Sequence, residues 1–275
     1  MKTIQGPGGV TVPRVGLGTL RNKGDDARAL VELALAEGFR HVDTGEYYGN
    51  EEPVGAGIAR SSVPRDDIWL TTKILHPKSD ATADVAAAAR GCLDRLGTSY
   101  VDALLVHWPG PKAPLGPTLT AMGELRDEGL ARTIGVSNFP SALLREALEV
   151  MPDLMLVQCE YHPYLDQSAV LQVVRDAGLV FTAHSPLALG RALEDPVVAE
   201  VAADAGLTPA QAVLRWLLSQ DRVTAIPGGH PDHPEHLREN LAAAEAPLDE
   251  AAMKRISDLA QGLRVVDPPH APDWD

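Results

Sequence analysis

Eight short apolar runs recur along the chain, and they constrain its fold more than any other feature. Most are rich in β-branched residues and nearly continuous rather than alternating, which is typical of parallel strands buried on both faces. The runs are 15–19, 41–44, 68–73, 101–107, 133–138, 154–158, 180–185 and 223–228. Segments with apolar residues at helical spacing lie between them, at 25–38, 81–97, 118–129, 141–150, 168–178 and 209–219.

This alternation predicts an α/β protein with a (β/α)8 TIM barrel, a fold of about 250 residues, and the chain has 275. The main rival is a doubly wound open sheet, which usually carries a Gly-x-Gly-x-x-Gly turn after its first strand. The first run continues as GLGTLRNKG, which lacks that spacing. We therefore expect one barrel domain over 1–275, with an N-terminal β-hairpin at 1–14 and an irregular C-terminal tail at 262–275.

The composition argues against several classes of protein. Apolar residues make up 45% of the chain, which rules out wholesale disorder. The net charge of −14 argues against nucleic-acid and anionic-membrane partners. Two Cys are too few for a disulfide scaffold, and the N-terminus has no apolar run of the kind found in secretory signals. We therefore expect a cytoplasmic protein that binds any anionic ligand through backbone amides, helix N-termini or a few cations.

Polar residues occupy the positions where the predicted strands end, and barrels gather their chemistry at that face. Asp43, Lys73 and His107 end the second, third and fourth runs, and Tyr48 follows in a loop. A satisfied polar layer, with Tyr48 packed on Pro53, would explain each residue singly. Three titratable side chains on adjacent strand ends favour a functional site, because each of them must be desolvated there.

Five motifs resemble the aldo/keto reductase family in order and spacing: GFRHVDTGEYYGNE, LTTK, LLVHWP, IGVSNF and QCEYHP. The resemblance extends from about residue 15 to residue 259. Two further segments, SPLALGRAL and APDWD, are most similar to those of bacterial 2,5-diketogluconate reductases. The resemblance implies a monomeric enzyme that reduces aldehydes and ketones with a hydride from a nicotinamide cofactor.

The resemblance also assigns catalytic roles. Tyr48 matches the proton donor of the family, and Lys73, fixed by Asp43, would lower the pKa of its phenol. His107 would orient the substrate carbonyl, and with Tyr48 it would stabilise the negative charge that develops on oxygen. Trp108 would form a wall of the substrate pocket, unless it is a core aromatic residue.

Matching by position implies the cofactor contacts in the same way. Those contacts are Ser137, Asn138 and Gln158 at the nicotinamide, with Asp43 beside them; Thr19 and Leu20 near the ribose; Ser185, Leu187, Gly190 and Arg191 along the pyrophosphate; and Glu239 and Asn240 at the adenine. Backbone amides in such loops can bind an anion without a positively charged surface.

Two departures from the family pattern bear on the cofactor. His184 stands where the family has an aromatic residue that stacks on the nicotinamide. Because a protonated imidazole would repel the oxidised ring, we expect weaker binding of oxidised cofactor below about pH 6.5. After the eighth run, Gly228 and Gly229 replace a Lys-containing segment, and His236 replaces an Arg. His230, His233, His236 and Arg238 are left to hold a 2′-phosphate, and they would bind it more weakly than a Lys–Arg pair. The resemblance favours NADP(H), while NAD(H) stays open.

His230, His233 and His236 recur at a three-residue spacing that zinc ligands can have. Pro231 and Pro234 argue against a regular ligating helix there. We therefore expect a solvated loop and no metal.

Two functions of other kinds stay open. The chain would be a nicotinamide-binding sensor if it bound cofactor without turnover. A metal hydrolase barrel typically needs a His-x-His pair on its first strand, which 15–19 lacks. The substrate, a small dicarbonyl or a keto sugar such as 2,5-diketogluconate, follows from subgroup likeness alone.

Overall fold

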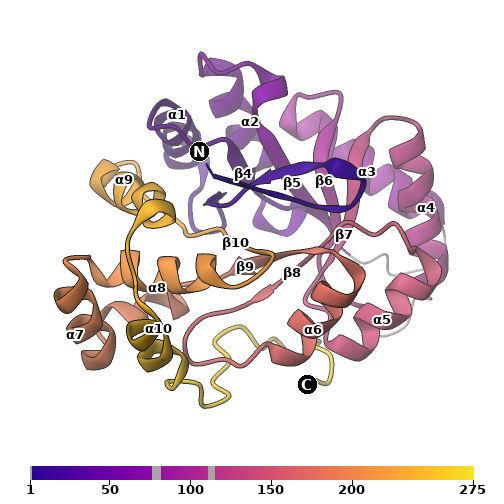
Figure 1. Cartoon of the computed structure of the whole chain (residues 1–275). Coiled ribbons are helices and arrows are strands. Elements are labelled where there is room, and N and C mark those ends of the chain that lie inside the picture. Colours follow the sequence, from indigo (N-terminus) through magenta and orange to yellow (C-terminus); the bar gives the residue numbers. More distant parts are fainter. Residues whose placement is uncertain (1, 76–81, 111–114) are drawn as a thin grey trace.

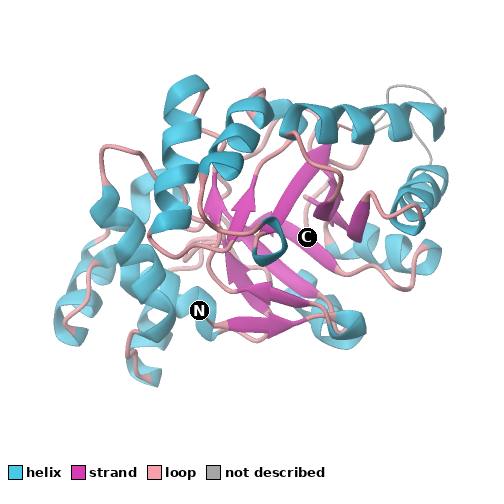
Figure 2. Cartoon of the chain, turned by 90° about the horizontal axis from the view of Figure 1, so that it is seen from above, coloured by secondary structure: helices cyan, strands magenta, loops and turns pink. Residues whose placement is uncertain are grey.

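The computed structural model describes residues 2–75, 82–110 and 115–275, and it shows a (β/α)8 barrel. Eight parallel strands form one sheet in the order β10-β9-β8-β7-β6-β5-β4-β3. Parallel bridges from Val15 to Ala225 and from Gly18 to Gly228 join its two edges. Figure 2 shows the helices arranged around these strands. The predicted fold class is confirmed.

Each of the eight predicted runs overlaps one strand of the barrel. The strands are β3 Leu17–Gly18, β4 His41–Asp43, β5 Trp69–Ile74, β6 Val101–Val106, β7 Ala131–Ser137, β8 Leu156–Glu160, β9 Val180–His184 and β10 Val223–Ala225. Nearly all their residues are buried, because helices cover one face of the sheet and the barrel interior the other. Continuous apolar runs therefore located the strands to within a few residues.

Six helices lie where helical spacing predicts them: α1 Gly24–Ala36, α3 Thr82–Leu96, α4 Leu115–Asp127, α5 Ser141–Val150, α6 Ser168–Ala177 and α8 Pro209–Ser219. Four further helices lie outside the predicted segments: α2 Glu51–Arg60, α7 Pro196–Ala205, α9 Pro234–Ala242 and α10 Glu250–Ser257. No single helix in the described part of the chain is long and apolar enough to cross a membrane. The bent pair α7 and α8, with 86° between its members, passes that test of length and composition only when joined.

Helix α2 contains two glycines, Gly55 and Gly57, which are poor helix formers, at points where its backbone lies against neighbouring segments. A Cβ added at Gly55 would lie 2.1 Å from the carbonyl oxygen of Leu96, and one at Gly57 would lie 2.7 Å from that of Arg28. Tertiary packing against α1 and α3 therefore overrides the weak propensity of the segment.

The prediction of a loop over 230–236 is wrong from Pro234 onward, where helix α9 begins. Proline is well tolerated in the first turn of a helix, so Pro234 does not prevent one.

The expected N-terminal hairpin is present, formed by β1 Thr3–Gln5 and β2 Thr11–Pro13 around a short 3-10 turn (Figure 1). Val12 packs in one apolar cluster with Trp69, Met155 and Val180. These three residues lie at or next to the first positions of β5, β8 and β9. The hairpin therefore covers the end of the barrel where the strands begin, and it leaves the opposite end open.

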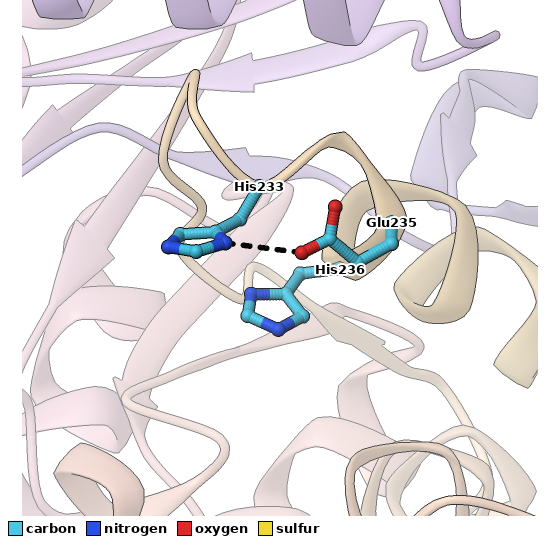
Figure 3. A group of neighbouring side chains, drawn as sticks. All are labelled: His233, Glu235 and His236. Atoms are coloured by element: carbon cyan, nitrogen blue, oxygen red, sulfur yellow. Dashed lines mark hydrogen bonds and ion pairs between the residues drawn. The ribbon is translucent and has the colours of Figure 1, made fainter.

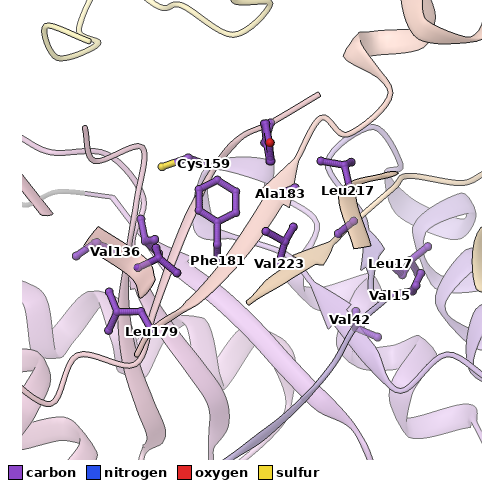
Figure 4. Packing of buried hydrophobic residues seen from close by; sticks show 14 of the residues in the cluster. Val15, Leu17, Val42, Val136, Cys159, Leu179, Phe181, Ala183, Leu217 and Val223 are labelled. Atoms are coloured by element: carbon purple, nitrogen blue, oxygen red, sulfur yellow. The ribbon is translucent and has the colours of Figure 1, made fainter. Parts of the chain in front are cut away.

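The main apolar core lies between the strands and the surrounding helices (Figure 4). Phe181 on β9 is fully buried there, and its ring contacts that of Tyr161 edge-on at 5.7 Å between centroids. Dense packing of this layer fixes the strands, and hence the positions of the side chains at their carboxyl ends.

We expect Phe181→Ala to lower the free energy of unfolding by about 3–5 kcal/mol, because it leaves a cavity in a packed core. Chemical denaturation followed by circular dichroism measures the loss. Val150→Ala is the control, since Val150 is 41% exposed and should change stability by less than about 0.5 kcal/mol. Equal effects of the two variants would contradict this description of the core.

Candidate active site

A cleft of about 740 Å3 opens where the carboxyl ends of the strands meet. Tyr48, His107 and Trp108 line one part of the cleft, and Pro227, Gly228 and His236 line a second part. This volume is within the range that accommodates cofactors and small substrates in proteins. The barrel therefore offers a large cleft at the face where its strands end.

A buried ion pair lies beside this cleft. The ammonium of Lys73, which is 0% exposed, donates to Asp43 Oδ1 at 2.5 Å, to the carbonyl oxygen of Thr44 at 2.7 Å and to Tyr48 Oη at 3.2 Å. Gln158 Nε2 donates to the other oxygen of Asp43 at 2.7 Å. All three ammonium protons have acceptors, so the buried charge is matched in both sign and hydrogen bonding.

Tyr48 differs from the expectation in the direction of its pKa. Burial raises the pKa of the phenol above its ordinary value, although the nearby Lys73 acts to lower it. Burial also lowers the pKa of Lys73, but Asp43 and Tyr48 outweigh this effect and raise it. Lys73 therefore acts on the phenol in the predicted direction, but burial outweighs it, and the pKa of Tyr48 lies above its ordinary value rather than below it. Tyr48 holds its proton at neutral pH, next to a permanent cation.

His107 is the neutral partner of Tyr48. The two rings meet edge-on with centroids 5.5 Å apart. Burial, with the nearby Lys73, lowers the pKa of His107 to about 2. Its Nδ1 atom is buried without a hydrogen-bond partner among the described residues. The imidazole is therefore neutral near physiological pH, and its one N–H can donate a hydrogen bond to an oxygen in the cleft.

His184 is held by hydrogen bonds on both ring nitrogens. Nε2 lies 2.9 Å from Asn138 Oδ1, and Nδ1 lies 3.2 Å from Ser185 Oγ. Asn138 also donates to the carbonyl oxygen of His107 at 2.9 Å. Burial lowers the pKa of His184 to about 4. The onset of weaker binding expected below pH 6.5 therefore moves down to about pH 4.

Most of the expected site residues line the cleft. They are Thr19, Leu20, Asp43, Tyr48, His107, Trp108, Ser137, Asn138, Gln158, His184, Ser185, Leu187, Gly190, Gly228 and His236. Lys73 lies behind this wall, and four other residues lie outside it: Arg191, His230, Glu239 and Asn240. Asn240 is buried, and its side chain donates to the carbonyl oxygen of Gly228 at 3.5 Å, so it supports the wall from behind.

The region near His236 carries imidazoles rather than fixed cations. His233 Nδ1 lies 3.0 Å from Glu235 Oε1, and the rings of His233 and His236 stack at 5.0 Å (Figure 3). Potential ligand atoms of these three exposed residues lie within 4.8 Å of one another, close enough to share a metal ion. The neighbouring Arg238 is engaged elsewhere, because both its Nε and its Nη2 donate to Glu37, at 2.9 and 2.7 Å.

The C-terminal tail, whose place at the pocket or over the barrel rim the sequence left open, contributes a wall of the cleft. Val266, Asp267, Pro268 and His270 line the cleft. Two backbone amides of the tail, those of residues 265 and 266, donate to the buried carboxylate of Glu160 at 2.6 and 2.8 Å. Glu160 lies in the motif QCEYHP, and these two partners lie 105 and 106 residues further along the chain.

Comparisons with known proteins agree with this arrangement. The model of the family described as "Aldo/keto reductase family" matches residues 14–261. Methylglyoxal reductase DkgB of Escherichia coli O157:H7 is 36% identical over 97% of this chain and 100% of its own length. An aldo-keto reductase of Mycobacterium avium is 37% identical over 94% and 90%. A crystal structure provisionally named 2,5-diketo-D-gluconic acid reductase B has a TM-score of 0.91 and 38% identity, covering 96% of this chain and 94% of that one.

We expect the imidazoles of His107 and His184 to remain neutral between pH 8 and pH 5.5. Burial lowers their pKa values to about 2 and about 4, so protonation is disfavoured in the folded state. Nitrogen-15 NMR of labelled histidine measures this directly, and the urea-unfolded chain is the control, in which histidine titrates near pH 6.5. A folded-state midpoint near 6.5 for either ring would contradict the described burial.

Proposed function

The chain belongs to the aldo/keto reductase family, and we propose that it reduces small aldehydes and ketones to alcohols with NADPH, using Tyr48 as the proton donor. Membership of the family and the named reductase relatives support NAD(P)H-dependent carbonyl reduction as the general activity. The proposal adds the roles of individual residues, the preferred cofactor and the class of substrate.

The observation that supports these roles most directly is the contact between Lys73 and Tyr48. Reduction of a carbonyl requires a hydride on carbon and a proton on oxygen, and the cofactor supplies the hydride when it is bound. Burial raises the pKa of Tyr48, so the phenol keeps its proton and is in the correct state to donate. Its hydroxyl accepts a hydrogen bond from the Lys73 ammonium at 3.2 Å, which would stabilise the phenolate left after the transfer.

His107 and Asp43 would act on the reacting groups in different ways. A neutral His107, with its ring edge against Tyr48, would donate a hydrogen bond to the substrate oxygen and orient the carbonyl. Asp43 would act through Lys73, because its carboxylate fixes the ammonium at 2.5 Å and balances its charge. We therefore assign Tyr48 and His107 to the substrate and Asp43 and Lys73 to the proton donor.

The residues along the cleft fit a dinucleotide cofactor. The segment Ser185–Gly190 has left-handed backbone conformations at Ser185, Ala188, Leu189 and Gly190. Such turns present backbone amides to an anion, which suits a pyrophosphate in a chain with a net charge of −14. Ser137, Asn138 and Gln158 would hold the carboxamide, with His184 stacked on the ring.

The proposed substrates are small dicarbonyl compounds or keto sugars. The relatives are named for methylglyoxal and for 2,5-diketo-D-gluconic acid, and they match nearly the full length of this chain. Activity can be surveyed with a panel of aldehydes, ketones and keto sugars, followed through the absorbance of NADPH and NADH in parallel.

Tyr48→Phe should lower kcat/KM by about 100-fold to 10,000-fold, because the general acid is lost. Tyr47→Phe is the matched control: Tyr47 is 70% exposed, also lines the cleft and should change the rate little. Cofactor binding, measured by fluorescence titration, should persist in both variants. If Tyr48→Phe kept its rate, the proton donor would be wrong, and a biological function that survives without turnover would support the sensor alternative.

His236→Ala should lower the preference for NADPH over NADH, because it removes the imidazole that lines the cleft where the 2′-phosphate would lie, while Arg238 is paired with Glu37. The ratio of the two kcat/KM values, measured at one pH, should fall about two- to tenfold, since a hydrogen bond contributes about 0.5–1.5 kcal/mol. A preference for NADH in the unsubstituted protein would overturn the choice of cofactor.

A further inference from the structure

We propose that the substrate end of the cleft, meaning the part around Tyr48, His107 and Trp108, selects uncharged carbonyl compounds and disfavours anionic ones through the carboxylate of Asp267. The inference rests on the proposed function and narrows its class of substrates. It separates an uncharged dicarbonyl such as methylglyoxal from a sugar acid such as 2,5-diketogluconate, which carries a carboxylate.

Asp267 is placed at this end by a chain of contacts. Its Oδ1 accepts a hydrogen bond from Trp274 Nε1 at 2.9 Å. The ring of Trp274 meets that of Trp108 with centroids 6.1 Å apart, and His270 meets Trp108 at 5.3 Å. Trp108 directly follows His107 in the sequence. The tail is therefore packed against the wall next to the catalytic imidazole.

The position of Asp267 is also fixed along the backbone. The two amides that directly precede it, those of Val265 and Val266, donate to Glu160, whose carboxylate is buried. Asp267 is thus held on both sides, by Glu160 before it and by Trp274 after it. A substrate would meet this carboxylate as part of the wall.

The other ionisable groups near this end are paired, uncharged or packed behind the wall. Asp43 is paired with Lys73 and Gln158, and His107 and His184 are neutral. The guanidinium of Arg264 lies 3.6 Å from the ring centre of Trp274, its Nη1 atom is buried, and the residue is not part of the cleft wall. Arg21 lies beside Leu20, in the part assigned to the cofactor.

Among the described residues at the substrate end, Asp267 is the charged side chain of the wall that makes no ion-pair contact within 4 Å, although Arg264 behind the wall is close enough to interact with its charge. The side chains around it include the apolar Leu75, Val266 and Pro268, together with Trp108 and His270. Repulsion between two carboxylates in a partly enclosed cleft is much stronger than in water. The net charge of −14 adds to it by slowing the approach of an anion. An apolar, uncharged carbonyl compound fits this wall best.

The test uses three benzaldehydes that differ only in the charge of the substituent opposite the aldehyde: 4-formylbenzoate, its methyl ester and 4-(trimethylammonio)benzaldehyde. We expect kcat/KM for the anion to be about tenfold or more below that for the ester, with the cation at least as good as the ester. Salt at 1 M should reduce the difference, because it screens exposed charges. In Asp267→Asn, which keeps an oxygen for Trp274, the ratio of ester to anion should fall several-fold.

Glu149→Gln provides the control, since it removes one negative charge from the exposed surface of α5 and should leave the ratio unchanged. Equal use of the anion and the ester, or a ratio that Asp267→Asn does not change, would overturn the inference while leaving carbonyl reduction intact. If none of the three aldehydes is reduced, the proposed function fails and the inference fails with it.

Discussion

The buried ion pair between Lys73 and Asp43 is the interaction on which the candidate active site depends. Two charges removed from water are tolerable only when they are close and all their hydrogen bonds are satisfied. Here β4 and β5, paired in parallel register, bring the two side chains together, and Thr44, Tyr48 and Gln158 complete their hydrogen bonds. The same ammonium contacts the phenol of Tyr48. The group that balances the buried charge of Asp43 is therefore also the one that can stabilise a phenolate.

The charges around the cleft are few, and most of them cancel. His107 and His184 are neutral because burial disfavours their protonated forms. The Lys73–Asp43 pair has no net charge, and Arg238 is paired with Glu37 outside the cleft. Under the proposed function, this strongly acidic chain would hold the dinucleotide through backbone amides. The charged ligands would then be selected by a few exposed groups, namely the imidazoles near α9 and the carboxylate of Asp267.

The sequence located the polar strand ends well because each lies within two residues of an apolar run. Asp43, Lys73, His107, Asn138 and Gln158 all lie at this face of the barrel, as expected. The contacts that sequence reasoning missed join distant segments: Glu160 with the tail, Arg238 with Glu37, and Trp108 with Trp274. The direction of the pKa of Tyr48 was missed for a related reason, because burial outweighs the nearby cation and the extent of burial cannot be counted from neighbours in sequence.

Local patterns by themselves determined the eight strands, six of the helices, the barrel and the family to which the chain belongs. Apolar periodicity and short motifs record which residues face inward and which stand at a strand end, and both are properties of neighbouring residues. Tertiary structure alone decided the close packing of α2, the helical start at Pro234, the protonation states in the cleft and the wall formed by the tail. These features depend on how closely segments far apart in the chain approach one another, and on how much water they exclude when they do.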